Sequence, residues 1–184
     1  MKKSLIALTT AALLATGGSA FAADQKFNVS TNPFSLAIGI INAQVDYKVH
    51  DKITVAPTFY MWNPKVGSTE FGFMGYGARV NYHSKGAYQS GLYGSGVFEY
   101  STFSAEYTDF FGTATGEASM TLFGAAGGYQ WFWDNNMNMK LGMGYGLASA
   151  GDLKMTYGDG SAASAGATIP SFGLIFDLTV GYKF

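Results

Sequence analysis

The chain has 184 residues, 25 of them glycine, and its 11 basic and 12 acidic side chains give a net charge of −1. Only 12% of the residues are charged, about half the usual share in a soluble domain, while 16% are aromatic. This composition excludes a collagen-like or disordered chain, the lack of cysteine excludes disulfide scaffolds and thiolate metal sites, and the small net charge offers no basic surface to nucleic acid.

The first 22 residues have the three parts of a secretory signal peptide. Lys2 and Lys3 provide a positive start, residues 5–14 form a short apolar stretch, and Ala20-Phe21-Ala22 fits the rule of small residues before a cleavage site. A membrane-spanning helix would need about 20 apolar residues, which this stretch does not reach. We therefore expect residues 1–22 to be removed after export and residues 23–184 to form one domain.

Most of the remaining chain alternates apolar residues with small or polar ones, which is the pattern of strands with one apolar face. In chain order, the alternation predicts eight strands, which cover residues 34–41, 43–49, 53–62, 69–82, 87–101, 118–133, 137–148 and 171–184. Residues 27–31 are either a further strand or a tail. Pro57 lies inside the third strand, where its missing N–H predicts a bulge or a shorter strand.

The predicted connections alternate in length. Short polar turns at residues 50–52, 84–86 and 134–136 alternate with longer links at residues 63–68, 102–117 and 151–170. Short turns on one side and long loops on the other are typical of bacterial outer-membrane barrels. Aromatic residues gather near the short turns on the more apolar face, as in an interfacial girdle: Tyr47, Tyr82, Tyr88, Trp131, Trp133, Tyr182 and Phe184.

The end of the chain resembles the terminal strand by which bacterial outer-membrane proteins are recognised for assembly. Its apolar residues stand at alternate positions and finish on an aromatic residue: Phe176, Leu178, Val180, Tyr182 and Phe184. Together with the signal peptide, the chain resembles the small eight-stranded outer-membrane barrels of the OmpA-barrel, OmpX and OmpW type. The resemblance implies an all-β, eight-stranded antiparallel up-and-down transmembrane β-barrel in a Gram-negative outer membrane, with lipid and the barrel-assembly machinery as its partners.

The interior of so small a barrel is just wide enough for side chains to fill, so a general porin channel is not expected. Six charged residues are predicted to point inward: Asp46, Lys48, Arg79, Glu99, Lys140 and Asp177. Because charges in a narrow lumen must pair, we expect an ion-pair network in which Asp177 or Asp46 pairs with Arg79. Glu99 has no evident partner. A path for protons or ions through these groups is the alternative.

Six large side chains are predicted to point inward near the long loops: Tyr60, Trp62, Phe71, Phe73, Met120 and Leu122. They face Gly142, Gly144 and Gly146, which leave room on the opposite wall. Two interpretations stay open. The large side chains pack against the small ones, or they line a pocket for a hydrophobic ligand, as the OmpW-type resemblance implies.

The sequence gives little support to catalysis. Its two histidines, His50 and His83, fall at short turns, and two histidines without cysteine make a zinc site improbable. We expect no catalytic residue, metal or cofactor. The predicted function is a structural or adhesin-like role, in which loops 102–117 and 151–170 bind an extracellular ligand or surface partner. The alternatives are a pocket or channel for small hydrophobic molecules and, more distantly, a lipid-modifying enzyme.

Overall fold

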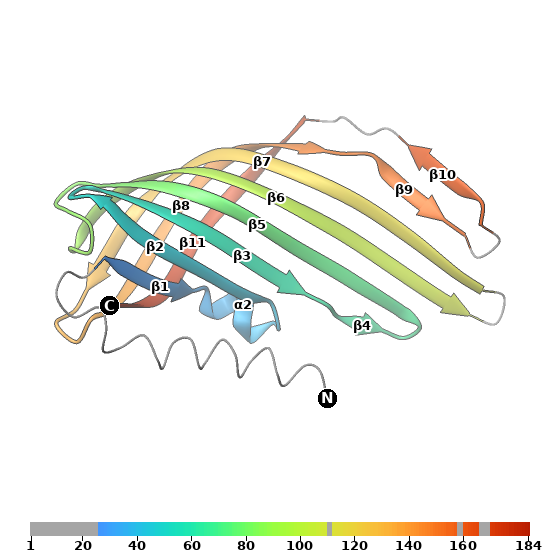
Figure 1. The fold of residues 1–184 in the computed structure, drawn as a ribbon, viewed down its shortest axis with the longest axis horizontal. Coiled ribbons are helices and arrows are strands. Elements are labelled where there is room, and N and C mark those ends of the chain that lie inside the picture. Colours follow the sequence, from blue (N-terminus) through green and yellow to red (C-terminus); the bar gives the residue numbers. More distant parts are fainter. Residues whose placement is uncertain (1–25, 110–111, 158–159, 166–169) are drawn as a thin grey trace.

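The computed structural model describes residues 26–109, 112–157, 160–165 and 170–184, whose strands form one antiparallel sheet (Figure 1). Within these residues, eight strands close into a ring in which each strand pairs with the next along the chain. In ring order they are β1 (Phe27–Thr31), β2 (Ile41–His50), β3 (Ile53–Trp62), β5 (Thr69–His83), β6 (Gly91–Asp109), β7 (Gly112–Phe132), β8 (Met137–Ala150) and β11 (Pro170–Lys183). Pairing of β1 with β11 completes the ring. The predicted all-β, antiparallel class is confirmed, whereas the predicted signal peptide lies outside the described residues.

The ring has two different ends, which we call the turn end and the hairpin end. At the turn end, on the left of Figure 1, residues 51–52, 84–90 and 133–136 join consecutive strands. At the hairpin end, β5, β6 and β7 extend well beyond the shorter strands. Three further short strands lie there: β4 (Lys65–Val66), β9 (Leu153–Thr156) and β10 (Ala162–Ala165).

The long loop predicted at residues 102–117 is strand throughout its described part, and the one predicted at residues 151–170 is strand in part. β6 and β7 stay paired as far as Asp109 and Gly112, and the second segment contains the β9–β10 hairpin. The prediction failed because apolar residues such as Phe103, Tyr107 and Leu153 are sparse in these segments, among small and polar residues. Backbone hydrogen bonds pair the strands of such a hairpin even where the apolar alternation is weak.

The strand predicted at residues 34–41 is also wrong, because this segment begins with the short helix α2 (Pro33–Ala37) and β1 takes its place in the ring. The Asn32 side chain accepts a hydrogen bond from the Ser35 N–H at 3.1 Å, and Pro33 supplies a backbone angle suited to a first turn. These local signals override the alternation of Phe34, Leu36 and Ile38. No helix among the described residues is long and apolar enough to cross a membrane.

Pro57 does not interrupt its strand. The β2–β3 register is the same on both sides of it, at Gln44↔Thr58 and Tyr47↔Val55, and β3 runs unbroken. The irregularity in this hairpin lies instead between Lys48 and His50, next to the turn. The predicted bulge at Pro57 is therefore absent from the described hairpin.

The two faces of the ring have opposite character. Its interior at the turn end is filled with polar and charged side chains, whereas large apolar side chains stand exposed on its outer surface. A small apolar cluster of Val97, Ala126 and Ile175 lies within the interior, with Leu122 packed against it. This distribution places the candidate functional groups inside the ring.

The seam between β7 and β8 depends on glycine at close approaches. A Cβ atom on Gly144 would overlap the carbonyl oxygen of Ala125 on the neighbouring strand, whereas a Cβ on Gly94 of β6 would meet no atom within 4 Å. We expect Gly144→Ala to lower the free energy of unfolding by about 1 to 3 kcal/mol, because the strands must separate to admit the methyl group. Gly94→Ala, the matched control, should leave it unchanged or slightly higher. Urea unfolding followed by tryptophan fluorescence measures both, and equal effects would contradict the close approach.

Candidate functional site

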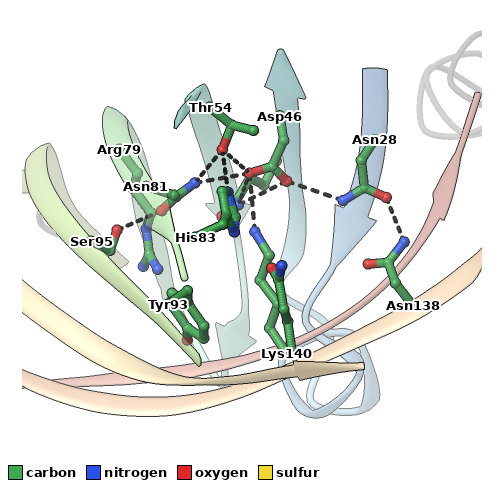
Figure 2. A network of polar contacts seen from close by, with 12 residues as sticks. Asn28, Asp46, Thr54, Arg79, Asn81, His83, Tyr93, Ser95, Asn138 and Lys140 are labelled. Atoms are coloured by element: carbon green, nitrogen blue, oxygen red, sulfur yellow. Dashed lines mark hydrogen bonds and ion pairs between the residues drawn. The ribbon is translucent and has the colours of Figure 1, made fainter. Parts of the chain in front are cut away.

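A buried polar network centred on Asp46 fills the turn end of the interior (Figure 2). The Asp46 carboxylate accepts hydrogen bonds from Asn28 Nδ2 (3.1 Å), Gln44 Nε2 (3.2 Å), Thr54 Oγ1 (3.4 Å), Asn81 Nδ2 (2.9 Å) and Lys140 Nζ (3.0 Å). Asp46 is 1% exposed and the Lys140 side chain 2% exposed, so water does not screen their attraction. The pair joins β2 to β8, which are not neighbours in the ring.

The network continues to side chains that were not predicted to belong to it. Its further contacts are Asn138 Nδ2 to Asn28 Oδ1, Ser95 Oγ to Asn81 Oδ1 (2.7 Å) and His83 Nε2 with Thr54 Oγ1 (3.1 Å). These residues carry one signal that could have revealed them. Asn81 and His83 stand an even number of positions from Arg79 on their own strand, Ser95 from Glu99, and Asn138 from Lys140.

A second cluster lies one layer nearer the hairpin end, around Arg79 of β5. Its guanidinium lies 3.1 Å from Asp177 Oδ2 of β11 and 3.4 Å from Glu99 Oε1 of β6. Tyr93 connects the two clusters, since its hydroxyl donates to Asp177 Oδ2 at 2.6 Å and Lys140 Nζ lies 5.8 Å from its ring centroid. One arginine is thus shared between two carboxylates.

The structure brings five of the six predicted lumen charges together. Arg79 pairs with Asp177, one of the two predicted partners, while Asp46 pairs with Lys140, and Arg79 also serves as the partner of Glu99. Lys48 does not join them. It lies at the end of β2, with its side chain 33% exposed, and its Nζ is 3.0 Å from Asp51 Oδ1 in the turn. That hydrogen bond lowers the pKa of the Asp51 carboxyl.

Residues 84–90 reach across the turn end of the ring, because Tyr88 is hydrogen-bonded to Asp46 of β2 and Ser90 to Phe132 of β7. Sequence predicts Tyr88 on the outer face of a strand, but it is buried in this turn. Its hydroxyl donates to the carbonyl oxygens of Lys26 (2.7 Å) and Asp46 (2.9 Å), and burial raises the pKa of that hydroxyl. Its φ of 63° is left-handed, a conformation that costs a non-glycine residue about 1 to 2 kcal/mol and that these contacts offset.

A cavity of about 270 Å³ lies beside the Arg79 cluster on its hairpin side, and we call it the middle cavity. Polar side chains of the cluster line one part of it, and apolar residues of β11 line another. A row of aromatic rings runs along the neighbouring strands β3, β5 and β6 at its hairpin side, with ring centroids 5.1 Å apart between Tyr60 and Phe73 and 4.5 Å apart between Phe73 and Phe103. Tyr60 and Phe73 line the middle cavity.

The wall of the ring has a gap next to this cavity. β1 pairs with β11 only from Val180 to Lys183, although β11 extends to Pro170. On the hairpin side of Val180, α2 rather than a paired strand stands beside this edge of β11. The middle cavity is lined by inner-face Asp177 and outer-face Phe176 alike, so it reaches the outer surface here.

A larger cleft of about 500 Å³, the upper cleft, lies on the inner face of the extended hairpins. Its lining is almost entirely apolar and includes Trp62, Phe71, Phe103 and Leu153, which are all partly exposed. Gly116 lines it on β7. An apolar cleft of this kind is suited to small hydrophobic ligands.

The six residues predicted to line one upper pocket are divided between these two cavities. Tyr60, Phe73 and Leu122 line the middle cavity, and Trp62 and Phe71 line the upper cleft. Met120 is outside the lining of both. The prediction did not separate the two sets because it did not foresee how far the strands extend at the hairpin end.

Within the described residues, no group of three or more histidine, aspartate and glutamate side chains is placed to hold a metal ion. The contact between Thr54 Oγ1 and His83 Nε2 is the one that most resembles a nucleophile and its base. Both side chains are buried inside the polar network, beneath the Arg79 cluster, where a substrate could not reach them without displacing it. The arrangement is suited to packing and binding.

Residues 6–167 match a protein family described as "Protein of unknown function (DUF3575)". The match covers most of the chain, including the strands that carry Asp46, Arg79, Glu99 and Lys140. No curated protein and no solved structure matches the chain.

The buried ion pair gives a direct prediction. We expect Lys140→Met to lower the free energy of unfolding by about 3 to 5 kcal/mol, because it leaves the Asp46 carboxylate without its cation inside the ring. The control is Lys48→Met, which removes a lysine from an exposed pair and should cost less than about 1 kcal/mol. Urea unfolding of the two refolded variants compares them, and similar losses would show that the interior pair is screened by water.

Proposed function

The chain belongs to the DUF3575 family, and we propose that this member is a non-enzymatic β-barrel of the bacterial outer membrane that binds small hydrophobic molecules at its hairpin end. In this proposal residues 1–22 are an export signal. Lipid covers the outer face of the ring, and the apolar upper cleft is the binding site. The terminal strand is recognised by the barrel-assembly machinery through Phe176, Leu178, Val180, Tyr182 and Phe184.

The observation that carries the proposal is the reversed distribution of polarity across the wall. Charged side chains such as Asp46 and Lys140 are buried, whereas Leu92 and Met143 are 63% and 64% exposed on the outer face. Seven of the eight ring strands carry exposed apolar or aromatic side chains. Examples, one from each of these strands, are Tyr47, Phe59, Val80, Leu92, Phe123, Met143 and Phe176. A water-soluble domain has the opposite arrangement, and so continuous an apolar surface requires a partner such as lipid.

Aromatic side chains support an orientation for the barrel. Tyr47, Tyr82, Trp133 and Tyr182 are exposed on the outer face near the turn end. Tyrosine and tryptophan favour the boundary between lipid and water, so this belt fits one membrane interface. Because outer-membrane barrels have short periplasmic turns, the turn end would lie in the periplasm and the hairpin end outside the cell.

The interior favours binding over conduction. The Asp46 network and the Arg79 cluster occupy the lumen at the turn end, and the turn around Tyr88 is hydrogen-bonded across its base. The upper cleft, in contrast, is apolar and open. A hydrophobic molecule would gain from leaving water for this surface.

A surface-interaction role is the second candidate, and the shape of the hairpin end favours it. The β6–β7 and β9–β10 hairpins project from the ring (Figure 1), and Tyr107 and Tyr157 are exposed on them. Exposed aromatic side chains on projecting elements are common in protein-binding surfaces. Binding of a protein partner, undiminished when the upper cleft is filled, would favour this candidate.

An outward charge tests the membrane location. Leu141 lies exposed on the outer face of β8, and we expect Leu141→Arg to lower the free energy of unfolding in phospholipid vesicles by about 2 to 4 kcal/mol. Val66→Arg, on β4 beyond the ring, is the control and should have little effect. Urea titration in vesicles measures both. Equal effects, or recovery of the native protein outside the outer-membrane fraction of cells, would contradict the proposal.

A second substitution tests the binding site. Gly116 lines the upper cleft, and a Cβ atom built on it meets no atom within 4 Å. We expect Gly116→Phe to fill the cleft and weaken binding of the apolar fluorophore N-phenylnaphthylamine about tenfold, whereas Thr115→Phe on the outer face should not. Fluorescence titration of the folded barrel measures this, and unchanged binding by Gly116→Phe would remove the cleft as the site.

A further inference from the structure

We propose that the middle cavity is a second binding site, which takes a single-chain amphiphile with a positively charged amine head. The ligand enters from the lipid through the gap between β2 and β11. This inference rests on the proposed membrane location, but it concerns a cavity and a ligand class separate from those of the upper cleft.

The charge of the cavity selects a cationic head. Its charged lining residues are Arg79, Glu99 and Asp177, so one positive charge faces two negative charges. The nearby Asp46 does not alter this balance, because Lys140 pairs with it. Beside Arg79, Glu99 and Asp177, an amine would complete two pairs of opposite charge, whereas a carboxylate or phosphate would be repelled.

Unpaired hydroxyl groups point to the same ligand. Thr58 Oγ1 and Thr179 Oγ1 are buried and have no hydrogen-bond partner among the described residues, and both side chains line the cavity. An ammonium group has three N–H donors, so it suits a lining that offers a carboxylate and hydroxyl oxygens as acceptors. Arg79 Nε is also unpaired, and a hydroxyl group beside the amine would accept its hydrogen bond.

The gap in the wall offers a place for the apolar tail of the ligand. Leu174, Phe176 and Leu178 of β11 line the cavity on one side of the gap, and Ala43 of β2 lines it on the other. On the hairpin side of Val180 this edge of β11 faces α2 rather than a paired strand, so its backbone groups beside the cavity lack the strand partner that a closed wall would supply. An alkyl chain lying in the gap would extend from the polar head to the surrounding lipid.

The test uses three probes with the same alkyl chain and different heads: decylamine, decanol and decanoate. The isotopically labelled full-length barrel is inserted in nanodiscs of zwitterionic phospholipid and titrated with each probe while amide NMR shifts are recorded. We expect decylamine to shift the amides of Thr58, Glu99 and Thr179, with an apparent affinity about tenfold tighter than decanol or decanoate. Glu99→Gln should remove the preference for decylamine over decanol. Glu106→Gln, an exposed position on the same strand, should keep it.

The outcomes separate the two proposals. If the protein does not insert in nanodiscs, the proposed membrane location is contradicted, and the proposed site in the middle cavity is contradicted with it. An inserted, folded barrel whose cavity amides do not move with decylamine overturns only the middle site. The same conclusion follows if decanoate binds as tightly as decylamine, or if the preference for decylamine survives Glu99→Gln.

Discussion

The buried pair between Asp46 and Lys140 is the interaction on which the rest of the structure depends. It joins β2 to β8 through the interior, and the Asp46 carboxylate gathers donors from three further strands, β1, β3 and β5. Burying two charges is unfavourable unless each is fully paired, so the surrounding positions must supply hydrogen bonds rather than hydrocarbon. A ring with this interior has no room for an apolar core at its turn end. Its large apolar side chains are consequently on the outside.

The features predictable from sequence are those that repeat. Alternation with a period of two identified seven of the eight ring strands at least in part, and it put Asp46, Arg79, Lys140 and Asp177 on one face because every second residue points the same way. Neutral polar residues such as Asn28 and Asn81 escaped notice. An amide on a strand has the same pattern whether it faces solvent or a buried carboxylate.

Other features depended on local chemistry that competes with alternation. The cap formed by Asn32 and the proline after it turn an apparently strand-like segment into α2, and the turn around Tyr88 is held by hydrogen bonds to residues distant in sequence. The lengths of β6 and β7 were underestimated because their outer halves pair through backbone groups with little help from apolar side chains. Both errors have one cause: hydrogen bonding to the backbone is nearly independent of side-chain polarity.

The hydrogen bonds of Tyr88 depend on the pairing of β1 with β2. One phenolic hydroxyl bridges the carbonyl oxygens of Lys26 and Asp46, which belong to the chain segments on either side of the β1–β2 pairing. The hydroxyl can make both hydrogen bonds only when the two acceptors are in place. Residues 84–90 therefore make their full set of contacts only after β1 has paired with β2. In a ring that still lacked β1, Tyr88 would lose the carbonyl oxygen of Lys26 as an acceptor.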